Sequence, residues 1–254
     1  MSRDDALALQ QRGLRDWVRM LSASAPDSYA IERDGLVAAV VPSSPQRSIP
    51  NSVRYADAGA LEAALGDLAE AYDGAGVAAW MVWVPEFDHE AIDALERAGH
   101  KLDGTPTAMS MQLADFEPLD PGDLDWDKSP EPQLLGVLNE RAYGLPTGSG
   151  IAAALATPPA LPDLRLYQAR ADGRPSCVLA TFDHGDDLGF YFVATDPDRR
   201  GRGLASRLMS VTMAEGRERG LRTTSLQSSA MGRPVYERLG FGADFEMRMY
   251  ERRR

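Results

Sequence analysis

The stretch VATDPDRRGRGLA, residues 193–205, joins an apolar strand to an amphipathic helix through a short turn rich in arginine and glycine. A helix N-terminus leaves backbone N–H groups without an intrahelical acceptor, and such groups bind phosphate well. Glycines 201 and 203 would let an anion touch the backbone, and Arg199, Arg200 and Arg202 add positive charge. The stretch predicts a phosphate site, and an ordinary tight turn with a solvated basic rim is the alternative.

The residues around this stretch predict a mixed α/β unit. Apolar alternation and turn chemistry indicate strands over 164–171, 177–183, 188–194, 221–225 and 245–250. Helices are expected from residue 204, with Leu204, Leu208 and Val211 on one face, and around 235–239. Gly220 and Gly240 follow the two helices as stop signals.

The N-terminal half repeats this order of elements. Strands are expected over 36–41, 52–55, 79–84 and 107–113, and helices over the segment with Leu61, Leu65, Leu68 and Tyr72 and over 88–98, capped by Asp88. We therefore expect two tandem domains, 1–118 and 119–254, joined at an acidic stretch rich in proline and glycine. The first copy has Asp57 and no arginine in the turn 55–59, and it has Leu95 where the second has Tyr236.

A second motif lies about thirty residues after the first, GRPVYERLGF at 232–241. It resembles motif B of the GCN5-related N-acetyltransferases (GNAT). Residues 193–205 resemble their motif A, Arg/Gln-x-x-Gly-x-Gly/Ala, through Arg200, Gly203 and Ala205. The resemblance covers residues 125–254 well and the first half in outline. It implies an α/β fold of two tandem GNAT-like domains, each a mixed, mostly antiparallel sheet flanked by helices, of which only the second is catalytic.

The resemblance also implies roles for individual residues. The cofactor-binding residues would be Val193, Ala194 and Thr195 for the pantetheine arm of acetyl-CoA, and Arg200, Gly201, Arg202, Gly203, Leu204, Ala205 and Ser206 for the pyrophosphate. Tyr236 would be the acid that protonates the departing thiolate, although a buried aromatic with a satisfied hydroxyl is the alternative. Ser229 stands where many relatives have an asparagine that contacts the cofactor.

The general base is not identified by the sequence. The candidates are Glu140, Asp183, His184, and a water held by Gln227 or Ser225. The helix over 139–146 would form one wall of the acceptor site, and the following Thr147-Gly148-Ser149-Gly150 would be either a mobile lid or a plain linker.

Composition excludes some classes of function. The net charge is −11, from 27 basic and 38 acidic residues, which argues against nucleic-acid and membrane partners and favours a cationic amine. The single cysteine, Cys177, permits no internal disulfide, is expected in a core, and suits a cytoplasmic protein. With one cysteine and three scattered histidines, we expect no metal site. The apolar run 77–84 is too short to cross a bilayer.

These observations favour an acetyl-CoA-dependent N-acetyltransferase that acts on a small amine or an amine-bearing metabolite by direct attack on the thioester. A non-catalytic acyl-CoA sensor or protein-interaction module, a modifier of basic proteins, and a relative of the tandem mycothiol synthases remain as alternatives. The oligomeric state is left open, a homodimer included.

Overall fold

The computed structural model describes residues 1–128, 130–146, 148–157 and 161–254. Its N-terminal half contains α1 (Arg3–Leu21), β1 (Tyr29–Arg33), β2 (Leu36–Val40), β3 (Ser52–Tyr55), α2 (Ala58–Gly74), β4 (Ala79–Pro85), α3 (His89–Arg97), β5 (Lys101–Gly104), β6 (Thr107–Gln112) and the 3₁₀ turn η1 (Leu113–Asp115). Most of the helices and strands expected from the sequence are present. Helix α1 and strands β1 and β5 were not foreseen.

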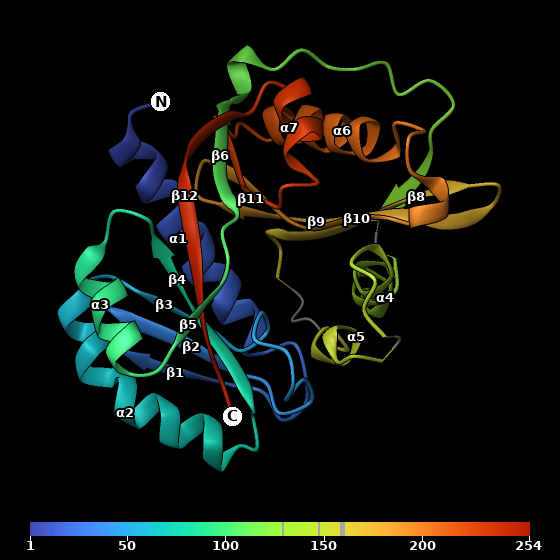
Figure 1. Cartoon of the computed structure of the whole chain (residues 1–254). Helices are drawn as coiled ribbons and strands as arrows, with labels where there is room; N and C mark the ends of the chain where they lie inside the picture. Colours follow the sequence, from blue (N-terminus) through green and yellow to red (C-terminus); the bar gives the residue numbers. More distant parts are fainter. Residues whose placement is uncertain (129, 147, 158–160) are drawn as a thin grey trace.

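The C-terminal half repeats the pattern (Figure 1). It contains β7 (Asp125–Lys128), α4 (Pro132–Ala142), α5 (Ile151–Ala154), β8 (Leu164–Ala171), β9 (Arg174–His184), β10 (Asp187–Thr195), η2 (Pro197–Arg199), α6 (Leu204–Glu218), β11 (Thr223–Ser228), α7 (Arg233–Arg238) and β12 (Gly242–Arg253). The strand boundaries differ from the expected ones by a few residues. The helix expected to contain residues 139–146 begins earlier, at Pro132, and ends at Ala142, and β7 and α5 were not foreseen.

The strands described form one mixed sheet in the order β1-β2-β3-β4-β12-β6-β11-β10-β9-β8-β7, with β5 paired to β12. The pairs β3–β4 and β10–β11 are parallel, and the other pairs are antiparallel. This arrangement confirms the expected fold class of mixed, mostly antiparallel sheets flanked by helices.

Each half gives its last strand to the sheet of the other half. Strand β6 lies between β11 and β12, with Ser110 opposite both Ser225 and Gly242. The distal part of β12 lies between β4 and β5, with Tyr250 opposite Val82 and Leu102. Strands on the two sides of the expected domain boundary, between residues 118 and 119, are therefore hydrogen-bonded to each other. The division into two domains at this boundary stays a prediction from the sequence.

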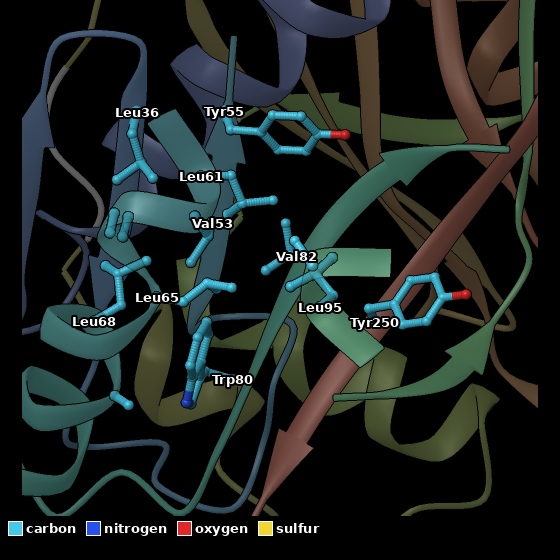
Figure 2. Close-up of a cluster of buried hydrophobic side chains, with 14 of the residues drawn as sticks. Leu36, Val53, Tyr55, Leu61, Leu65, Leu68, Trp80, Val82, Leu95 and Tyr250 are labelled. Atoms are coloured by element: carbon cyan, nitrogen blue, oxygen red, sulfur yellow. The ribbon is translucent and has the colours of Figure 1, made fainter. Parts of the chain in front are cut away.

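The core of the N-terminal half shows this exchange in its packing. Side chains from β2, β3, β4, α2 and α3 enclose an apolar cluster, and Tyr250 enters it from the far end of the chain (Figure 2). Tyr250 is buried, and its hydroxyl donates to Glu96 over 3.0 Å. Burial of a ring of this size contributes several kcal/mol, so the last strand is a structural part of the first half.

Helix α1 fills the space between the two halves of the sheet (Figure 1). It contacts β2 and β3 in the first half and β9 and β11 in the second. Ser2 caps it by accepting from the backbone N–H of Asp5 over 3.2 Å. Its buried residues Trp17, Val18 and Leu21 pack with β2 and β9 in a shared core. Helices α6 and α7 cover the opposite face of the C-terminal sheet.

Candidate functional site

Strands β10 and β11 separate along their length and open the sheet. They pair only over Asp187–Gly189 and Thr223–Ser225. A β-bulge interrupts the β9–β10 ladder between Tyr191 and Ala194, and Phe192 has a φ of 51° there. Asn139 on α4 donates to the carbonyl of Phe192 over 3.1 Å and holds the bulge in place. The bulge removes Phe192 and Val193 from regular pairing at the point where the strands separate.

A pocket of about 650 Å³ occupies this opening. Its C-terminal wall includes the bulge, Gln227, Ser229 and Tyr236, and its helical wall includes Trp17 of α1 and Tyr143 after α4. The N-terminal half supplies the third wall through Trp83, residues 103–106 and the loop 47–49, and Met249 and Glu251 of β12 lie beside it. Both halves of the chain therefore build the site.

Tyr236 lies in this pocket, on α7, with 8% of its surface exposed. A Cβ on Gly232 would stand 2.8 Å from the Tyr236 ring, so the absence of a side chain at 232 gives the ring its place. Burial, with a smaller effect of nearby Tyr143, raises the pKa of Tyr236 well above its usual value. The phenol is therefore protonated at neutral pH and able to donate a proton.

The turn before α6 presents backbone donors without acceptors. Gly201 and Gly203 have φ values of 77° and 71°, in the left-handed region that glycine adopts without strain. Gly203 is the N-cap of α6 and provides no side-chain cap. Among the described residues, the N–H groups from Gly201 to Ser206 have no hydrogen-bond acceptor. Such a run of donors at a helix N-terminus fits a diphosphate.

The arginines of this turn are partly engaged by protein groups. Arg199 and Arg202 both pair with Asp172, over 3.3 and 3.5 Å. Arg200 donates to the carbonyl of Ala142 over 2.6 Å. The positive charge expected from the sequence is therefore offset in part, and the backbone donors are the stronger feature of the site.

The corresponding turn of the N-terminal half is closed. Asp57 caps α2 by accepting from the N–H of Ala60 over 2.8 Å, in an extended conformation. Gly59 has no positive φ. Leu95, at the position expected to match Tyr236, is fully buried in the core. The first copy thus satisfies its helix N-terminus with its own carboxylate, where an anion would be repelled.

Several residues singled out in the sequence make contacts within the protein. The hydroxyl oxygen of Ser229 accepts from the N–H of Gly232 over 3.2 Å, so it shapes the turn into α7 while lining the pocket. Thr195 donates to Cys177 over 3.5 Å. The Cys177 thiol is buried in the core, as expected, and burial raises its pKa to about 11.

Two of the candidate bases hold the fold together. Glu140 is 1% exposed and accepts from the N–H groups of Gly148 and Ile151 over 2.9 and 3.1 Å. Asp183 pairs with Arg165 and Arg219 over 2.8 and 2.9 Å. Neither carboxylate lines the pocket. Thr147, at the start of the expected lid, lies outside the described residues.

The remaining candidates lie near the pocket in a network that includes α1. Gln227 lines the pocket and donates to Gln10, and Ser225 donates to the buried Asp187 over 2.6 Å. His184 is buried and contacts Asp16 of α1 and Tyr191 of β10. Asp16 and Tyr191 were not expected at the site, because α1 and the bulge were not foreseen.

Two other features are absent from the part of the chain that the structure describes. No helix there is both long enough and apolar enough to cross a membrane. Within the same residues, no group of three or more histidine, cysteine, aspartate or glutamate side chains is placed to hold a metal ion.

Comparisons with known proteins agree with this geometry. Residues 162–242 match the family model described as Acetyltransferase (GNAT) domain. A GCN5-related N-acetyltransferase from Kribbella flavida is 15% identical with a TM-score of 0.68, and 95% of each chain is covered. A tandem GNAT protein from the clavulanic acid biosynthesis pathway is 13% identical with a TM-score of 0.61, over 100% of this chain and 97% of the other.

A putative GNAT acetyltransferase from Novosphingobium aromaticivorans is 19% identical with a TM-score of 0.55, over 89% of this chain and 91% of the other. The comparison with curated proteins gives no match. At these identities the structural likeness concerns the fold. The chain therefore has the fold of GNAT proteins, and residues 162–242 of its C-terminal half match the GNAT acetyltransferase domain.

Proposed function

We propose that the protein transfers the acetyl group of acetyl-CoA to the amine of a small molecule. The observation that carries the proposal is the run of free N–H groups from Gly201 to Ser206, at the end of the strand whose bulge lines the pocket with Tyr236. A diphosphate and a reacting carbonyl each need donors of this kind. The match of residues 162–242 to the GNAT domain supports the same reaction.

In this proposal each part of the site has one task. The backbone from Gly201 to Ser206 binds the pyrophosphate of acetyl-CoA, which supplies the activated acetyl thioester. The β10 backbone at Val193 to Thr195 pairs with the pantetheine arm, and the bulge offers an N–H to the thioester carbonyl. The amine attacks directly, and Tyr236 protonates the departing thiolate.

The proposal assigns unequal tasks to the two halves of the chain. The C-terminal half binds acetyl-CoA, because α6 begins without a side-chain cap, whereas its counterpart α2 is capped. The N-terminal half, with Asp57 capping α2, contributes the wall around Trp83 and residues 103–106 against which the acceptor lies. This is a tandem arrangement with one active half.

A thiol-release assay tests the function. Purified protein is mixed with acetyl-CoA and a panel of primary amines, free thiol is followed over time, and CoA binding is measured by calorimetry. Thiol release that depends on one class of amine, with the acetylated product identified by mass spectrometry, is the expected result. CoA binding without turnover of any amine would instead identify a non-catalytic acyl-CoA sensor.

A further inference from the structure

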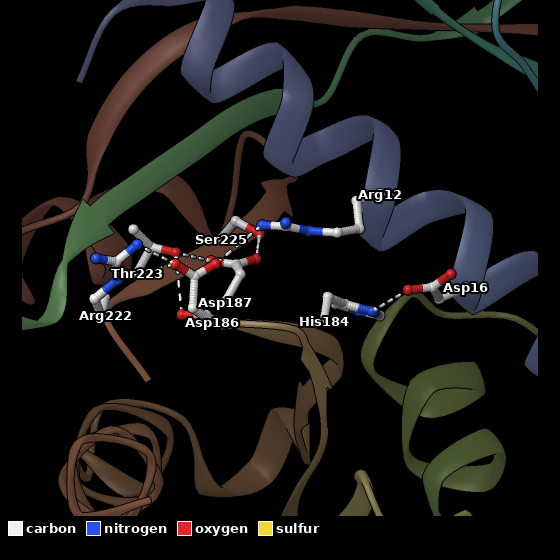
Figure 3. A network of polar contacts seen from close by, with 8 residues as sticks. All are labelled: Arg12, Asp16, His184, Asp186, Asp187, Arg222, Thr223 and Ser225. Atoms are coloured by element: carbon white, nitrogen blue, oxygen red, sulfur yellow. Dashed lines mark hydrogen bonds and ion pairs between the residues drawn. The ribbon is translucent and has the colours of Figure 1, made fainter. Parts of the chain in front are cut away.

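Two buried side chains, Tyr191 and His184, and the partly exposed Asp16 connect the pocket to the surface of α1. The Nδ1 atom of His184 lies 3.1 Å from the carboxylate of Asp16, and its Nε2 atom lies 2.8 Å from the hydroxyl of Tyr191. Figure 3 shows His184 reaching from the β9–β10 hairpin toward Asp16 on the helix. Tyr191 lines the pocket and is the last residue paired before the bulge.

The proton positions follow from the partners. Burial acts to raise the pKa of Asp16, but hydrogen bonds from His184 and Arg15 lower it overall, so Asp16 is an ionised acceptor. His184 must therefore donate to Asp16 through Nδ1–H, which leaves Nε2 of the neutral ring to accept from Tyr191. Burial raises the pKa of Tyr191 well above its usual value, so the phenol carries its proton.

The backbone is shaped to admit these rings. A Cβ on Gly13 of α1 would lie 3.0 Å from the Tyr191 hydroxyl, and one on Gly189 would lie 2.9 Å from both rings. The Tyr191 ring also stacks on Trp17, with centroids 4.1 Å apart and planes 4° apart. Two glycines and an aromatic stack thus fix the geometry of the network at the point where α1 crosses the sheet.

Carboxylates of two elements lie next to His184. Asp16 lies on one side, and Asp187 is directly opposite in the hairpin. Burial raises the pKa of Asp187, against hydrogen bonds from Ser225 and Thr223 that lower it. Arg12 is the nearby cation on α1, and Asp186 pairs with it over 3.3 Å. Two carboxylates therefore lie next to the His184 ring, and the nearby cation, Arg12, is itself paired with Asp186.

We propose that Tyr191, His184 and Asp16 form the relay that removes the proton from the acceptor ammonium, an inference that rests on the proposed function. The acceptor gives one N–H proton to the Tyr191 oxygen, directly or through one water, while the Tyr191 hydroxyl proton moves to Nε2 of His184. Asp16 stabilises the imidazolium, and the proton leaves to solvent at the 25% exposed side chain of Asp16.

The rest of the reaction balances around this step. The neutral amine forms a bond to the thioester carbon, the carbon–sulfur bond breaks, and Tyr236 protonates the thiolate. The proton that the new amide nitrogen sheds restores the Tyr236 hydroxyl. One proton in all leaves through the relay, which gives the site the base that neither Glu140 nor Asp183 supplies.

The test compares two nucleophiles of different basicity. Tyr191→Phe keeps the ring stacked on Trp17 and removes only the hydroxyl. We expect kcat/KM to fall about 100-fold for the best alkylamine of the panel. With methoxyamine, whose nitrogen is unprotonated at pH 7, kcat/KM should change less than threefold. Asp16→Asn should lower kcat and move the acidic limb of the pH profile to lower pH, because a protonated relay loses its counter-charge.

Asp5→Asn is the matched control, because Asp5 is an exposed carboxylate on the same helix as Asp16 and contacts Ser2 outside the relay. It should leave the ratio between the nucleophiles unchanged, and an unchanged dissociation constant for CoA shows that each variant is folded. Equal losses with both nucleophiles in Tyr191→Phe, or no loss, would overturn the relay alone. Absence of turnover by the unaltered protein with every amine would overturn the proposed function as well.

Discussion

The surroundings of the Tyr236 hydroxyl determine its protonation. It lines the pocket, its ring is held over Gly232, and burial keeps it protonated. Because burial raises the pKa of the phenol above that of a thiol, the phenol gives up its proton only as negative charge develops on the departing thiolate beside it. The alternative is a buried tyrosine with a satisfied hydroxyl. It fits less well, because no hydrogen bond to another described residue contributes to the pKa shift of Tyr236.

Tyr236→Phe removes that hydroxyl and leaves the ring in place. We expect kcat to fall about 100-fold with little change in KM, because the proton transfer occurs only in the transition state. The measurement is steady-state thiol release with varied amine at saturating acetyl-CoA. The melting temperature should not change, and a kcat equal to that of the unaltered protein would remove Tyr236 from the mechanism.

His100 is a second residue with an unusual environment, in the core of the first half. It is 3% exposed, it packs edge-on against Trp80, and neither ring nitrogen has a partner among the described residues. Burial, followed by the charge of Arg252, lowers its pKa from 6.5 to about 4. His100 lies five residues after Leu95, as Phe241 lies five residues after Tyr236, and Phe241 is buried in the second half.

A folded pKa below the unfolded value makes His100 a source of acid sensitivity. Between pH 6.5 and about 4 the unfolded chain binds a proton that the folded chain excludes, so stability falls as pH decreases, by about 3 kcal/mol in all. His100→Phe should remove this part of the pH dependence, as measured by urea unfolding from pH 7 to pH 4. The exposed His89 is the control, and an identical slope in His100→Phe and the unaltered protein would contradict the expectation.

At the scale of single elements, the two copies differ at one helix N-terminus. Helix α6 begins after two left-handed glycines and has no cap, whereas α2 begins at Asp57, which caps it. The same fold element is therefore open to an anion in one half and closed in the other. The sequence already showed this contrast, because the turn before α6 contains arginines and glycines and the turn before α2 contains Asp57.

Gly203→Glu and Gly59→Glu test the contrast directly. The first places a carboxylate among free N–H groups and strains a φ of 71°, so the dissociation constant for CoA should rise at least 100-fold. The second adds an acid to the first turn of α2, where the helix dipole tolerates it, and should leave CoA binding unchanged. Calorimetry measures both, and Gly203→Ala separates strain from charge. Equal effects at 203 and 59 would contradict the model of one active half.

At the scale of the whole molecule, strand exchange joins the two halves. The last strand of each half completes the sheet of the other, and α1 packs against both. Neither half buries its core fully without residues from the other, as Tyr250 shows in the first core. The pocket lies at this junction, so the exchange also fixes the wall formed by the N-terminal half relative to the β10 bulge.

Tyr250→Ala should therefore destabilise the whole protein, although only four residues of the sequence follow it. Loss of this buried ring costs about 3–5 kcal/mol, and the expected result is one unfolding transition shifted to lower temperature. Scanning calorimetry is the measurement, and Tyr29→Ala, at an exposed ring, is the control. A two-step melt in which only one step shifts would show that the halves unfold independently.

The sequence by itself determined the local elements, because strand alternation, helix faces, caps and left-handed glycines depend on near neighbours. It also indicated the phosphate turn and Tyr236, since both lie in short continuous motifs. Helix α1 also has local signals, with Ser2 as a cap and an apolar face through Leu14 and Trp17. It was not predicted, because it lies outside the repeated order of elements on which the prediction was based.

Only the tertiary structure decided which strands pair across the halves, which candidates are free and what faces His184. These depend on contacts between residues far apart in sequence, such as Asp16 and His184 or β6 and β11. A local sequence pattern does not predict such pairings, because the backbone N–H and C=O groups at a free strand edge are the same in every strand. The motif therefore located the turn that we propose to bind phosphate, and the packing of α1 and β12 formed the pocket that we propose for the acceptor.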